Sequence, residues 1–576
     1  MSVVSTSKKA DLGDLSKTSN LTRAIRGSGN LGEYIEVEFV DAQGNKQTRH
    51  VLDACGGAAV ACFGNGGRQA EDEGEFKDLY KMIKRMYEDR DKYDNPYGKV
   101  MLAAMLQMIE ISYSMHYAYT TPVHSLLTER LRDNVNAPVT EWENENEKMS
   151  NVMILNSGSE VCDAMVKLAW QYHNGQTKMT EDGIEVAVEA VNKKEVVITR
   201  NTSYHGNTVQ ALSLSEFPTR KANFRGLFEE GNLRKVDRYY PYRDMKEGQS
   251  QDTYDDELIR GLVETIENVK ISGKEVAAFV IETVSGAALG CQMPSVRYLR
   301  KVKKVCRKHD ILLVYDEIMC GLGRIGYANA WHYFDEEFRK EQTEKREKKE
   351  KEELDYVTDP SVKKTQPLPH IKNLAPDMIL IGKVLGAGIE PASGVVCSGK
   401  IVKKIQDSNR KLTEFSHGHT FQAHGVVCAA ALETQRILPP FLPEIQTRGK
   451  RLREGLKDIA KSHDNIGDVR GNGFFWGVEF VKDKDRKKPF SPSLNIANKF
   501  VKDAQFSKDL EARGIDVYAG QWTGIPDAND FLQGDHVIIA PAFHATENLI
   551  DTILEAFEAA VERFFEKENL RKLVQV

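Results

Sequence analysis

Short continuous runs of apolar residues alternate, along the middle of the chain, with longer segments in which apolar residues recur every three to four positions. The runs cover residues 152–155, 196–199, 276–281, 311–315 and 378–381. Helical periodicity falls between some of them, as in the segments 161–173 and 295–309. Continuous β-rich runs separated by helices predict a mostly parallel sheet covered on both faces. The expected fold class is therefore α/β.

Composition and charge narrow the range of partners. The chain has 576 residues, 41% of them apolar, and a formal net charge of −6 at pH 7. This acidic balance offers no long-range attraction to polyanions, so we expect neither a nucleic-acid nor a membrane partner. No stretch approaches the ~18 uncharged apolar residues of a spanning helix. The first twenty residues lack the apolar block of a secretory signal, and we expect a cytoplasmic protein.

The distribution of the cysteines also favours a cytoplasmic location. The 8 cysteines are scattered, with no Cys-x-x-Cys pair and no Cys/His cluster at metal-ligand spacing. Reduced thiols in a reducing compartment fit this distribution best. We therefore expect no structural metal site.

One segment stands apart in composition. From residue 335 to 354 the chain reads DEEFRKEQTEKREKKEKEEL, in which charges of both signs are mixed, and a stretch containing proline and lysine follows to residue 369. Mixed charge of this density predicts a solvated helix or a flexible insertion at about 335–370. A regulatory docking segment is the alternative.

Small, acidic, aromatic or lysyl residues follow each apolar run. They are residues 157–159 after the first run, residues 204–206 after the second, and Glu282, Asp316 and Lys383 after the next three. Ligands of open α/β sheets bind outside the carboxyl ends of the strands. Each residue alone has an ordinary explanation, such as a helix cap for Asp316 or a solvated surface lysine for Lys383. Together they fit one chemical task.

That task is the chemistry of pyridoxal phosphate. Ser157-Gly158-Ser159, opening a helix, offers backbone N–H groups and a positive helix end to a phosphate. The ring of Tyr204 can stack on a flat heterocycle. The carboxylate of Asp316 can hold a pyridine nitrogen protonated, and the amine of Lys383 can form an imine. A phosphate anchor, a ring clamp, an electron-sink partner and a Schiff base are what a protein supplies to this cofactor.

Glycine-rich segments offer a competing interpretation. Residues 27–32 match Gly-x-Gly-x-x-Gly but precede a strand-like segment instead of following a strand. Residues 321–326 match it too, but residues 316–320 separate them from the preceding apolar run, whereas the dinucleotide fingerprint needs its first glycine at the turn itself. Gly382-Lys383 is no P-loop, because Val384 occupies the Ser/Thr position. None of these segments predicts a nucleotide site.

At this point the motifs become recognisable as a set. In chain order they read NSGSEVCDAMVKLA, YHG, VIETVSGAALG, LLVYDEIMCGLGRIG, PDMILIGKVLGAGIEPASGVV, HGHTFQAHGVVCAAALE, VRGNGFFWGVEFV and GDHVIIAPA, at residues 156–169, 204–206, 280–290, 312–326, 376–396, 417–433, 469–481 and 534–542. In this order the chain resembles the class III (omega) aminotransferases, which are fold type I pyridoxal-phosphate enzymes. The resemblance implies a large, mostly parallel-sheet domain and a smaller α+β domain built from both termini.

The resemblance also implies roles for individual residues. Lys383 would hold the cofactor as a Schiff base and then move the substrate proton, and Asp316 would bind the pyridinium nitrogen. Tyr204 and Ile318 would pack on opposite faces of the ring. Thr420 would reach the cofactor phosphate of a partner subunit, so the resemblance implies a homodimer. The expected catalytic residues are Lys383, Asp316 and Tyr204, and the expected cofactor-binding residues are Ser157, Gly158, Ser159, Tyr204, His205, Glu282, Asp316, Ile318, Lys383 and Thr420.

Departures from the family pattern bear on the substrate. Met319 stands where many members carry a glutamine that reaches the phenolic oxygen of the cofactor. Residues 530–533 contain no arginine, where several members place one for the substrate carboxylate, and Ala59 lies where some place a bulky tryptophan. We therefore expect a sizeable amine donor whose nitrogen is not next to a carboxylate, and a keto-acid acceptor such as pyruvate. Candidate pocket walls, each of which could equally be simple packing, are His116, Tyr119 and Trp522.

The expected reaction is a ping-pong transamination. Another reaction on the same scaffold, as in a mutase, racemase, decarboxylase or lyase, is the nearest alternative, because the pocket selects which bond the cofactor breaks. A nucleotide-dependent oxidoreductase and an inactive scaffold protein are alternatives from other classes. We expect residues 1–95 to contribute to the small domain, residues 96–425 to form the cofactor domain, and residues 426–576 to form the C-terminal domain.

Overall fold

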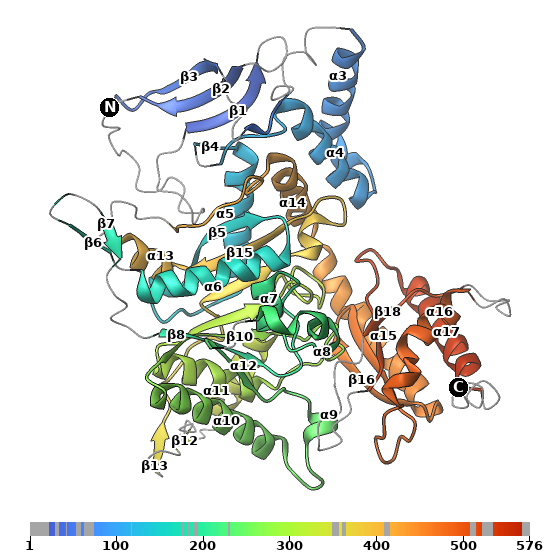
Figure 1. Cartoon of the computed structure of the whole chain (residues 1–576). Coiled ribbons are helices and arrows are strands. Elements are labelled where there is room, and N and C mark those ends of the chain that lie inside the picture. Colours follow the sequence, from blue (N-terminus) through green and yellow to red (C-terminus); the bar gives the residue numbers. More distant parts are fainter. Residues whose placement is uncertain are drawn as a thin grey trace. The chain divides into compact units, whose positions relative to one another are not determined.

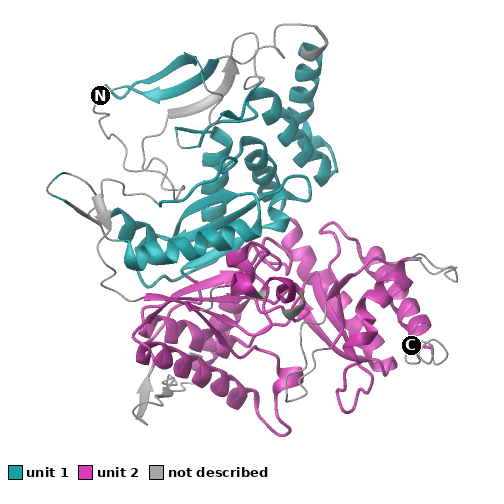
Figure 2. Ribbon diagram, in the orientation of Figure 1, with its two compact units in different colours: residues 1–193, 377–439 teal, residues 194–376, 440–576 magenta. Residues whose placement is uncertain are grey.

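The computed structural model describes residues 22–28, 34–41, 43–52, 54, 59–62, 74–116, 118–175, 177–180, 182, 185–187, 194–228, 231–347, 356–359, 364–407, 415–506, 514–520 and 534–566. The chain divides into two compact units, coloured separately in Figure 2. Unit 1 comprises Met1–Lys193 and Asp377–Pro439, and unit 2 comprises Lys194–Pro376 and Pro440–Val576. Among the described helices, none is both long enough and apolar enough to cross a membrane.

The sheet of unit 1 brings together strands that are far apart in the sequence. Strand β15 (Ser393–Ser398) lies between β5 (Met149–Leu155) and β14 (Met378–Ile381) and runs antiparallel to both. Strands β5 and β14 therefore run in the same direction, and their carboxyl ends lie at the same edge of the sheet. Helix α6 (Gly158–Asn174) packs against β14 and β15 (Figure 1).

Helices and a second sheet complete unit 1. Helix α14 (Gly425–Ile437) packs against both α4 (Pro96–Glu110) and α5 (Pro122–Asn136). The N-terminal strands pair in the order β3-β2-β1-β4. Unit 1 also contains, among the elements labelled in Figure 1, β1 (Thr22–Ser28), β2 (Tyr34–Val40), β3 (Lys46–Leu52), α3 (Gly74–Glu88), β4 (Tyr119–Thr120), β6 (Thr177–Met179), β7 (Glu185–Ala187) and α13 (Gly399–Gln406).

The sheet of unit 2 is parallel. Its strands lie in the order β11-β10-β8-β9, with β8 (Lys194–Arg200), β9 (Leu233–Val236), β10 (Glu275–Glu282) and β11 (Leu312–Asp316) all running in one direction. Helix α10 (Gln251–Ile271) packs on β9 and β10, and α11 (Val296–Lys308) packs on β11. Strands β10 and β11 are buried almost throughout, as their apolar runs predict. The predicted strands and the α/β class are confirmed.

The C-terminal part of unit 2 has its own antiparallel sheet. Its strands, in the order β16-β17-β19-β18, are β16 (Ile466–Asn472), β17 (Phe475–Phe480), β19 (His536–Ile539) and β18 (Tyr518–Gly520). Three helices accompany it, α15 (Phe441–Ser462), α16 (Ile496–Phe506) and α17 (Glu547–Phe564). Side chains of these helices and strands share one apolar core, which includes Leu452, Phe480, Phe500 and Phe557.

A buried ion network joins this sheet to the segment before α10. The carboxylate of Glu479 is fully buried and accepts hydrogen bonds from Arg470 Nη1 at 2.8 Å and from Arg243 Nε at 2.7 Å. The hydroxyl of Tyr240 also donates to this carboxylate. The two arginines hold the pKa of Glu479 at about 2 against the opposing effect of its burial.

The first residue of the charged segment 335–354, Asp335, is buried and not exposed to solvent as predicted. Helix α12 (Ala330–Glu347) contains the described part of that segment. Asp335 is buried on this helix and accepts hydrogen bonds from Leu374 N at 2.7 Å and from Arg339 Nε at 3.2 Å. The solvated part of the segment therefore begins only after Phe338, because the first turns of α12 carry the buried side chains of Trp331, Phe334 and Phe338 into the core.

Candidate active site

Asp316 ends strand β11 with its carboxylate fixed by two donors. His205 Nδ1 donates to Asp316 Oδ2 at 2.8 Å, and the backbone N–H of Ile318 donates to Asp316 Oδ1 at 3.1 Å. Both Asp316 and His205 are buried. The two donors thus fix the position of the Asp316 carboxylate, and a carboxylate is the kind of group that pairs with a cationic ring nitrogen.

The neighbouring carboxyl, Glu317, serves the fold instead. It is buried and accepts the backbone N–H groups of Ala330 and Trp331, each at 2.7 Å, and the side-chain amide of Asn329 at 3.2 Å. It therefore caps the start of α12, although burial raises its pKa to about 7. Consecutive acidic residues at the end of β11 thus have different tasks.

The aromatic ring expected to clamp a cofactor follows strand β8. Tyr204 is half-buried, and its ring meets that of Phe217 edge to face, with centroids 5.8 Å apart. The guanidinium of Arg220 lies over the Tyr204 ring, 4.8 Å from its centroid. These contacts fix the plane of the phenol ring, while its stacking on a cofactor stays a prediction.

Glu282 ends strand β10 beside the Asp316 group. The two residues are paired in the parallel register of β10 and β11. Its Oε1 accepts the backbone N–H of Gly286 at 3.1 Å, and burial raises its pKa. Asp316, His205, Ile318 and Glu282 thus form one cluster in unit 2.

In unit 1, the expected phosphate anchor lies at the start of α6. Ser157 caps the helix, with its Oγ accepting the backbone N–H of Glu160 at 3.2 Å. The side chain of Glu160 reaches back to the N–H of Asn156 at 3.1 Å, which completes a capping box. Gly158 and Ser159 form the first turn, where a helix presents N–H groups and positive potential to an anion.

Lys383 lies at the same sheet edge. Strand β15 begins beside the ends of both β5 and β14, since Leu155 pairs with Ser393 and Ile381 pairs with Gly394. The ends of β5 and β14 are therefore two strand spacings apart, about 10 Å. Lys383 is exposed two residues beyond Ile381, and its backbone is left-handed, with φ of 46°.

A left-handed backbone is unusual for a lysine. It costs about 1 kcal/mol or more in a residue with a Cβ, and such conformations cluster at functional sites. Within the described residues, no hydrogen bond or ion pair holds the Lys383 amine. The covalent role of Lys383 stays a prediction.

Thr420 lies in a turn tied to the end of β5. The backbone N–H of Ala423 donates to Ile154 O at 3.1 Å, and the Tyr113 hydroxyl donates to Thr420 O at 3.1 Å. Thr420 itself is exposed. Its expected contact with a partner's phosphate stays a prediction.

The ten candidate residues thus fall into two sets, and some substrate candidates lie elsewhere. Unit 2 holds Tyr204, His205, Glu282, Asp316 and Ile318, and unit 1 holds Ser157, Gly158, Ser159, Lys383 and Thr420. Met319 packs close to Gly286, where an added Cβ would come within 2.6 Å of its sulfur. Trp522 and residues 530–533 lie outside the described residues.

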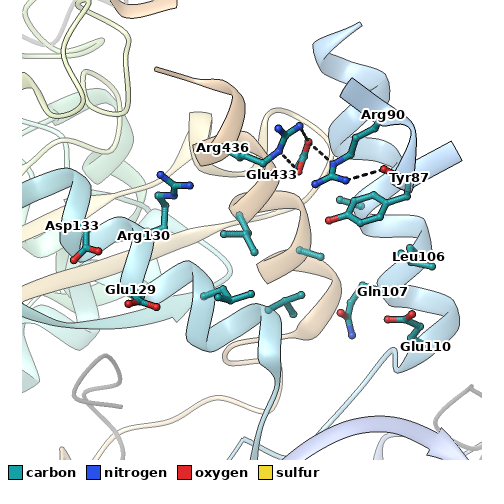
Figure 3. A pocket seen from close by; sticks show the side chains of 15 residues that line it. Tyr87, Arg90, Leu106, Gln107, Glu110, Glu129, Arg130, Asp133, Glu433 and Arg436 are labelled. Atoms are coloured by element: carbon teal, nitrogen blue, oxygen red, sulfur yellow. Dashed lines mark hydrogen bonds and ion pairs between the residues drawn. The ribbon is translucent and has the colours of Figure 1, made fainter. Parts of the chain in front are cut away.

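A pocket of about 550 Å³ in unit 1 lies apart from these candidates (Figure 3). It is lined by residues of α4, α5 and α14 together with Tyr87 of α3 and Arg90, and none of the ten candidates lines it. At one end Glu433 is buried and accepts hydrogen bonds from Arg90 Nε at 3.1 Å and from Arg436 Nε at 2.9 Å. The sequence analysis missed this group, because Arg90 and Glu433 are 343 positions apart and no motif joins them.

The residues of both sets fit pyridoxal phosphate. The carboxylate of Asp316, buried and held by two donors, suits a pyridinium nitrogen. The capped start of α6 suits a phosphate, and the amine of Lys383 suits an aldehyde carbon. The chemistry of these groups therefore suits the ring nitrogen, the phosphate and the aldehyde of the cofactor.

Comparison with known proteins identifies the family. The model of the class III aminotransferases matches residues 96–337 and 368–561. An aminotransferase from Gibberella zeae is 32% identical over 418 residues, which cover 72% of this chain and 69% of that protein. Gamma aminobutyrate transaminase 2 from Solanum lycopersicum is 28% identical over 417 residues, covering 72% of this chain and 74% of that protein.

Solved structures agree on the fold. A crystal structure of an omega transaminase from Pseudomonas jessenii, in complex with PMP, superposes with a TM-score of 0.63 and 23% sequence identity. The match covers 94% of this chain and 92% of that one. The chain is a pyridoxal-phosphate-dependent enzyme of fold type I and belongs to the class III aminotransferases.

Proposed function

We propose that the enzyme transfers an amino group from an amine, one whose nitrogen is not next to a carboxylate, to a keto acid such as pyruvate. The reaction is ping-pong, so the donor leaves its amino group on the enzyme before the acceptor binds. The observation that carries the donor class is Met319, an apolar side chain seated against Gly286 where many family members have a glutamine. The tomato relative supports it, because γ-aminobutyrate carries its nitrogen away from its carboxylate.

Within this proposal each set of residues has a task. Pyridoxal phosphate, when bound, supplies an aldehyde that takes up the amine and a pyridinium that accepts an electron pair. Asp316 holds the proton on the ring nitrogen, and His205 orients the Asp316 carboxylate through the hydrogen bond between them. Lys383 carries the cofactor between turnovers and moves a proton to and from the substrate carbon.

The remaining residues bind and orient. Tyr204 and Ile318 hold the ring between them, and the start of α6 at Ser157–Ser159 binds the phosphate. We further propose a homodimer, in which Thr420 of each subunit reaches the phosphate bound by its partner. Its support is the family resemblance and the exposure of Thr420 in a turn anchored to Ile154 and Tyr113. The cytoplasmic location, and the division of the chain near residues 95 and 425, are also parts of the proposal.

A half-reaction tests the reaction type. The purified holoenzyme is mixed with a primary amine in the absence of acceptor, and its visible absorbance is followed. A transaminase loses this absorbance once per active site and regains it on addition of pyruvate. A decarboxylase, racemase or lyase keeps its absorbance under the same conditions, and this result would refute transamination.

The donor class is tested in the same assay. A panel of primary amines and ordinary α-amino acids is compared at equal concentration, with pyruvate and with 2-oxoglutarate as acceptors. Faster conversion by any α-amino acid than by every amine contradicts the proposed donor. The Lys383→Ala variant serves as the control, since it removes the covalent attachment and the proton carrier together.

A further inference from the structure

Two buried carboxyl groups meet at the ends of neighbouring strands in unit 2. Glu282 ends β10, Asp316 ends β11, and the two residues are partners in the parallel register. Glu282 is 6% exposed and Asp316 is 5% exposed. Buried carboxylates this near each other repel, so a pair in this position does not readily carry two charges.

The carboxyl group of Asp316 accepts more hydrogen bonds than that of Glu282. Both oxygens of Asp316 accept a hydrogen bond, from His205 Nδ1 at 2.8 Å and from Ile318 N at 3.1 Å. Glu282 receives one, from Gly286 N to its Oε1 at 3.1 Å. Its Oε2 is buried and has no hydrogen-bond partner among the described residues. An ionised carboxylate would leave a buried charge uncompensated at this oxygen, which costs more than leaving the O–H of a neutral carboxylic acid there without an acceptor.

We propose that Glu282 is a neutral carboxylic acid in the working enzyme and acts as a positioning residue, so that the negative charge of the pair stays on Asp316. This inference rests on the proposed function, in which Asp316 must be ionised to pair with the ring nitrogen. A neutral Glu282 adds no second negative charge beside Asp316. Its Oε1 also fixes the turn at Gly286, on which Met319 is seated.

The other charged and titratable groups around Glu282 agree with this assignment. Arg200, from the end of β8, donates to the main-chain oxygen of Glu282 at 2.8 Å and not to its carboxyl group. The thiol of Cys320 is buried, and its pKa is well above the usual range, so it stays neutral. The electrostatic effect of His205 lowers the pKa of Glu282, but the Nδ1–H of His205 donates its hydrogen bond to Asp316 and not to Glu282. Burial remains the largest influence on the Glu282 carboxyl and raises its pKa.

Infrared spectroscopy tests the protonation state directly. A protonated carboxyl group has a C=O stretch above the amide band, and an ionised one does not. We expect the wild-type apoenzyme and holoenzyme at pH 7 to show such a band, part of which disappears in Glu282→Gln. Any contribution from Glu317 is present in both proteins and cancels in the difference spectrum. The matched control is Glu264→Gln, which changes an exposed glutamate of α10 and should remove no band.

The holoenzyme gives a second readout in the pH titration of its visible absorbance. Glutamine copies the shape and neutrality of the proposed acid, so Glu282→Gln should leave the midpoint within about 0.3 of a pH unit. Removal of a buried negative charge beside Asp316 would instead move it by about one unit or more. Glu282→Met, which is also neutral and of similar length, repeats both measurements if the glutamine variant fails to fold.

Two results would overturn the assignment. One is a wild-type spectrum at pH 7 without any protonated-carboxyl band, which needs no variant. The other is a midpoint that moves by a unit in the neutral variants. The band is measured on the apoenzyme without an amine, so its failure is separate from failure of the half-reaction, which tests transamination itself.

Discussion

Replacement of Glu479 by glutamine should destabilise the C-terminal part of unit 2 severely. The substitution keeps the shape of the side chain and removes its charge. Arg470 and Arg243, which are largely buried, then lose the carboxylate they share. Arg470 keeps Asp468 at 2.9 Å, whereas Arg243 is left without a carboxylate partner among the described residues. An uncompensated buried charge costs more than a missing hydrogen bond, because it cannot recover the hydration it lost on folding.

Two independent arguments give the magnitude. Truncation of one partner of a buried ion pair costs about 3–5 kcal/mol in general. The pKa of Glu479 falls from 4.5 to about 2 on folding. At about 1.4 kcal/mol for each pKa unit, this shift corresponds to about 3 kcal/mol of stabilisation at neutral pH.

The assay is chemical unfolding followed by tryptophan fluorescence, since Trp476 is buried on the same strand, β17. Asp551→Asn is the matched control. Asp551 pairs with Arg451 at 2.5 Å, but both side chains are well exposed, so its loss should cost less than about 1 kcal/mol. A difference of less than about 1 kcal/mol between the two variants would refute the reasoning.

The pH dependence gives an independent check of the same network. The folded-state pKa of Glu479 lies below its unfolded value, so its stabilisation is present in full above about pH 4.5. It is lost progressively as the pH falls from 4.5 towards 2, where the folded protein also takes up the proton. The gap between wild type and Glu479→Gln should therefore narrow in this window and stay constant between pH 6 and 8. A gap that is unchanged at pH 3 would contradict this origin.

Three further substitutions test the site and its supports. Ser157→Ala removes the cap of α6 and should lower the free energy of unfolding by about 1 kcal/mol, measured by denaturant unfolding of the apoenzyme, with Ser157→Thr retaining most of it. Gly473→Ala places a Cβ 2.5 Å from the backbone of Ile325 at a φ of 54°, so we expect a loss of about 3 kcal/mol or more, seen as a lower yield of folded protein and a lower Tm. Asp316→Asn should reduce the rate of the amine half-reaction by at least about a hundredfold (~3 kcal/mol) while the purified protein still binds cofactor, measured by absorbance and by cofactor release on denaturation.

Local sequence patterns predicted much of the fold. The apolar runs at 276–281 and 311–315 correspond to β10 and β11, and the helical periodicity at 161–173 corresponds to α6. These patterns succeed because burial on both faces of a parallel strand leaves a continuous apolar signature. The direction of β15 could not be predicted, because strand direction depends on the path of the chain and not on which residues are apolar.

The candidate site could be predicted only in part, for a related reason. Asp316 and Lys383 follow apolar runs, so their place at strand ends is a local property. The bond between His205 and Asp316 joins residues 111 positions apart, and no spacing rule links them. Charge density likewise predicted solvent exposure for Asp335, whose burial depends on Leu374, a residue 39 positions away.

The register of β10 and β11 makes the length of these strands as important as their composition. Side chains alternate between the faces of a strand, so deletion of a single residue within β11 would bring Glu317 in place of Asp316 to the position opposite Glu282. Every candidate residue would still be encoded, but Asp316 would face the other side of the sheet. In a library of random variants, one-codon deletions inside 312–316 should therefore be purged more uniformly than substitutions there. The alignment of two strands is in this sense an inherited part of the candidate site.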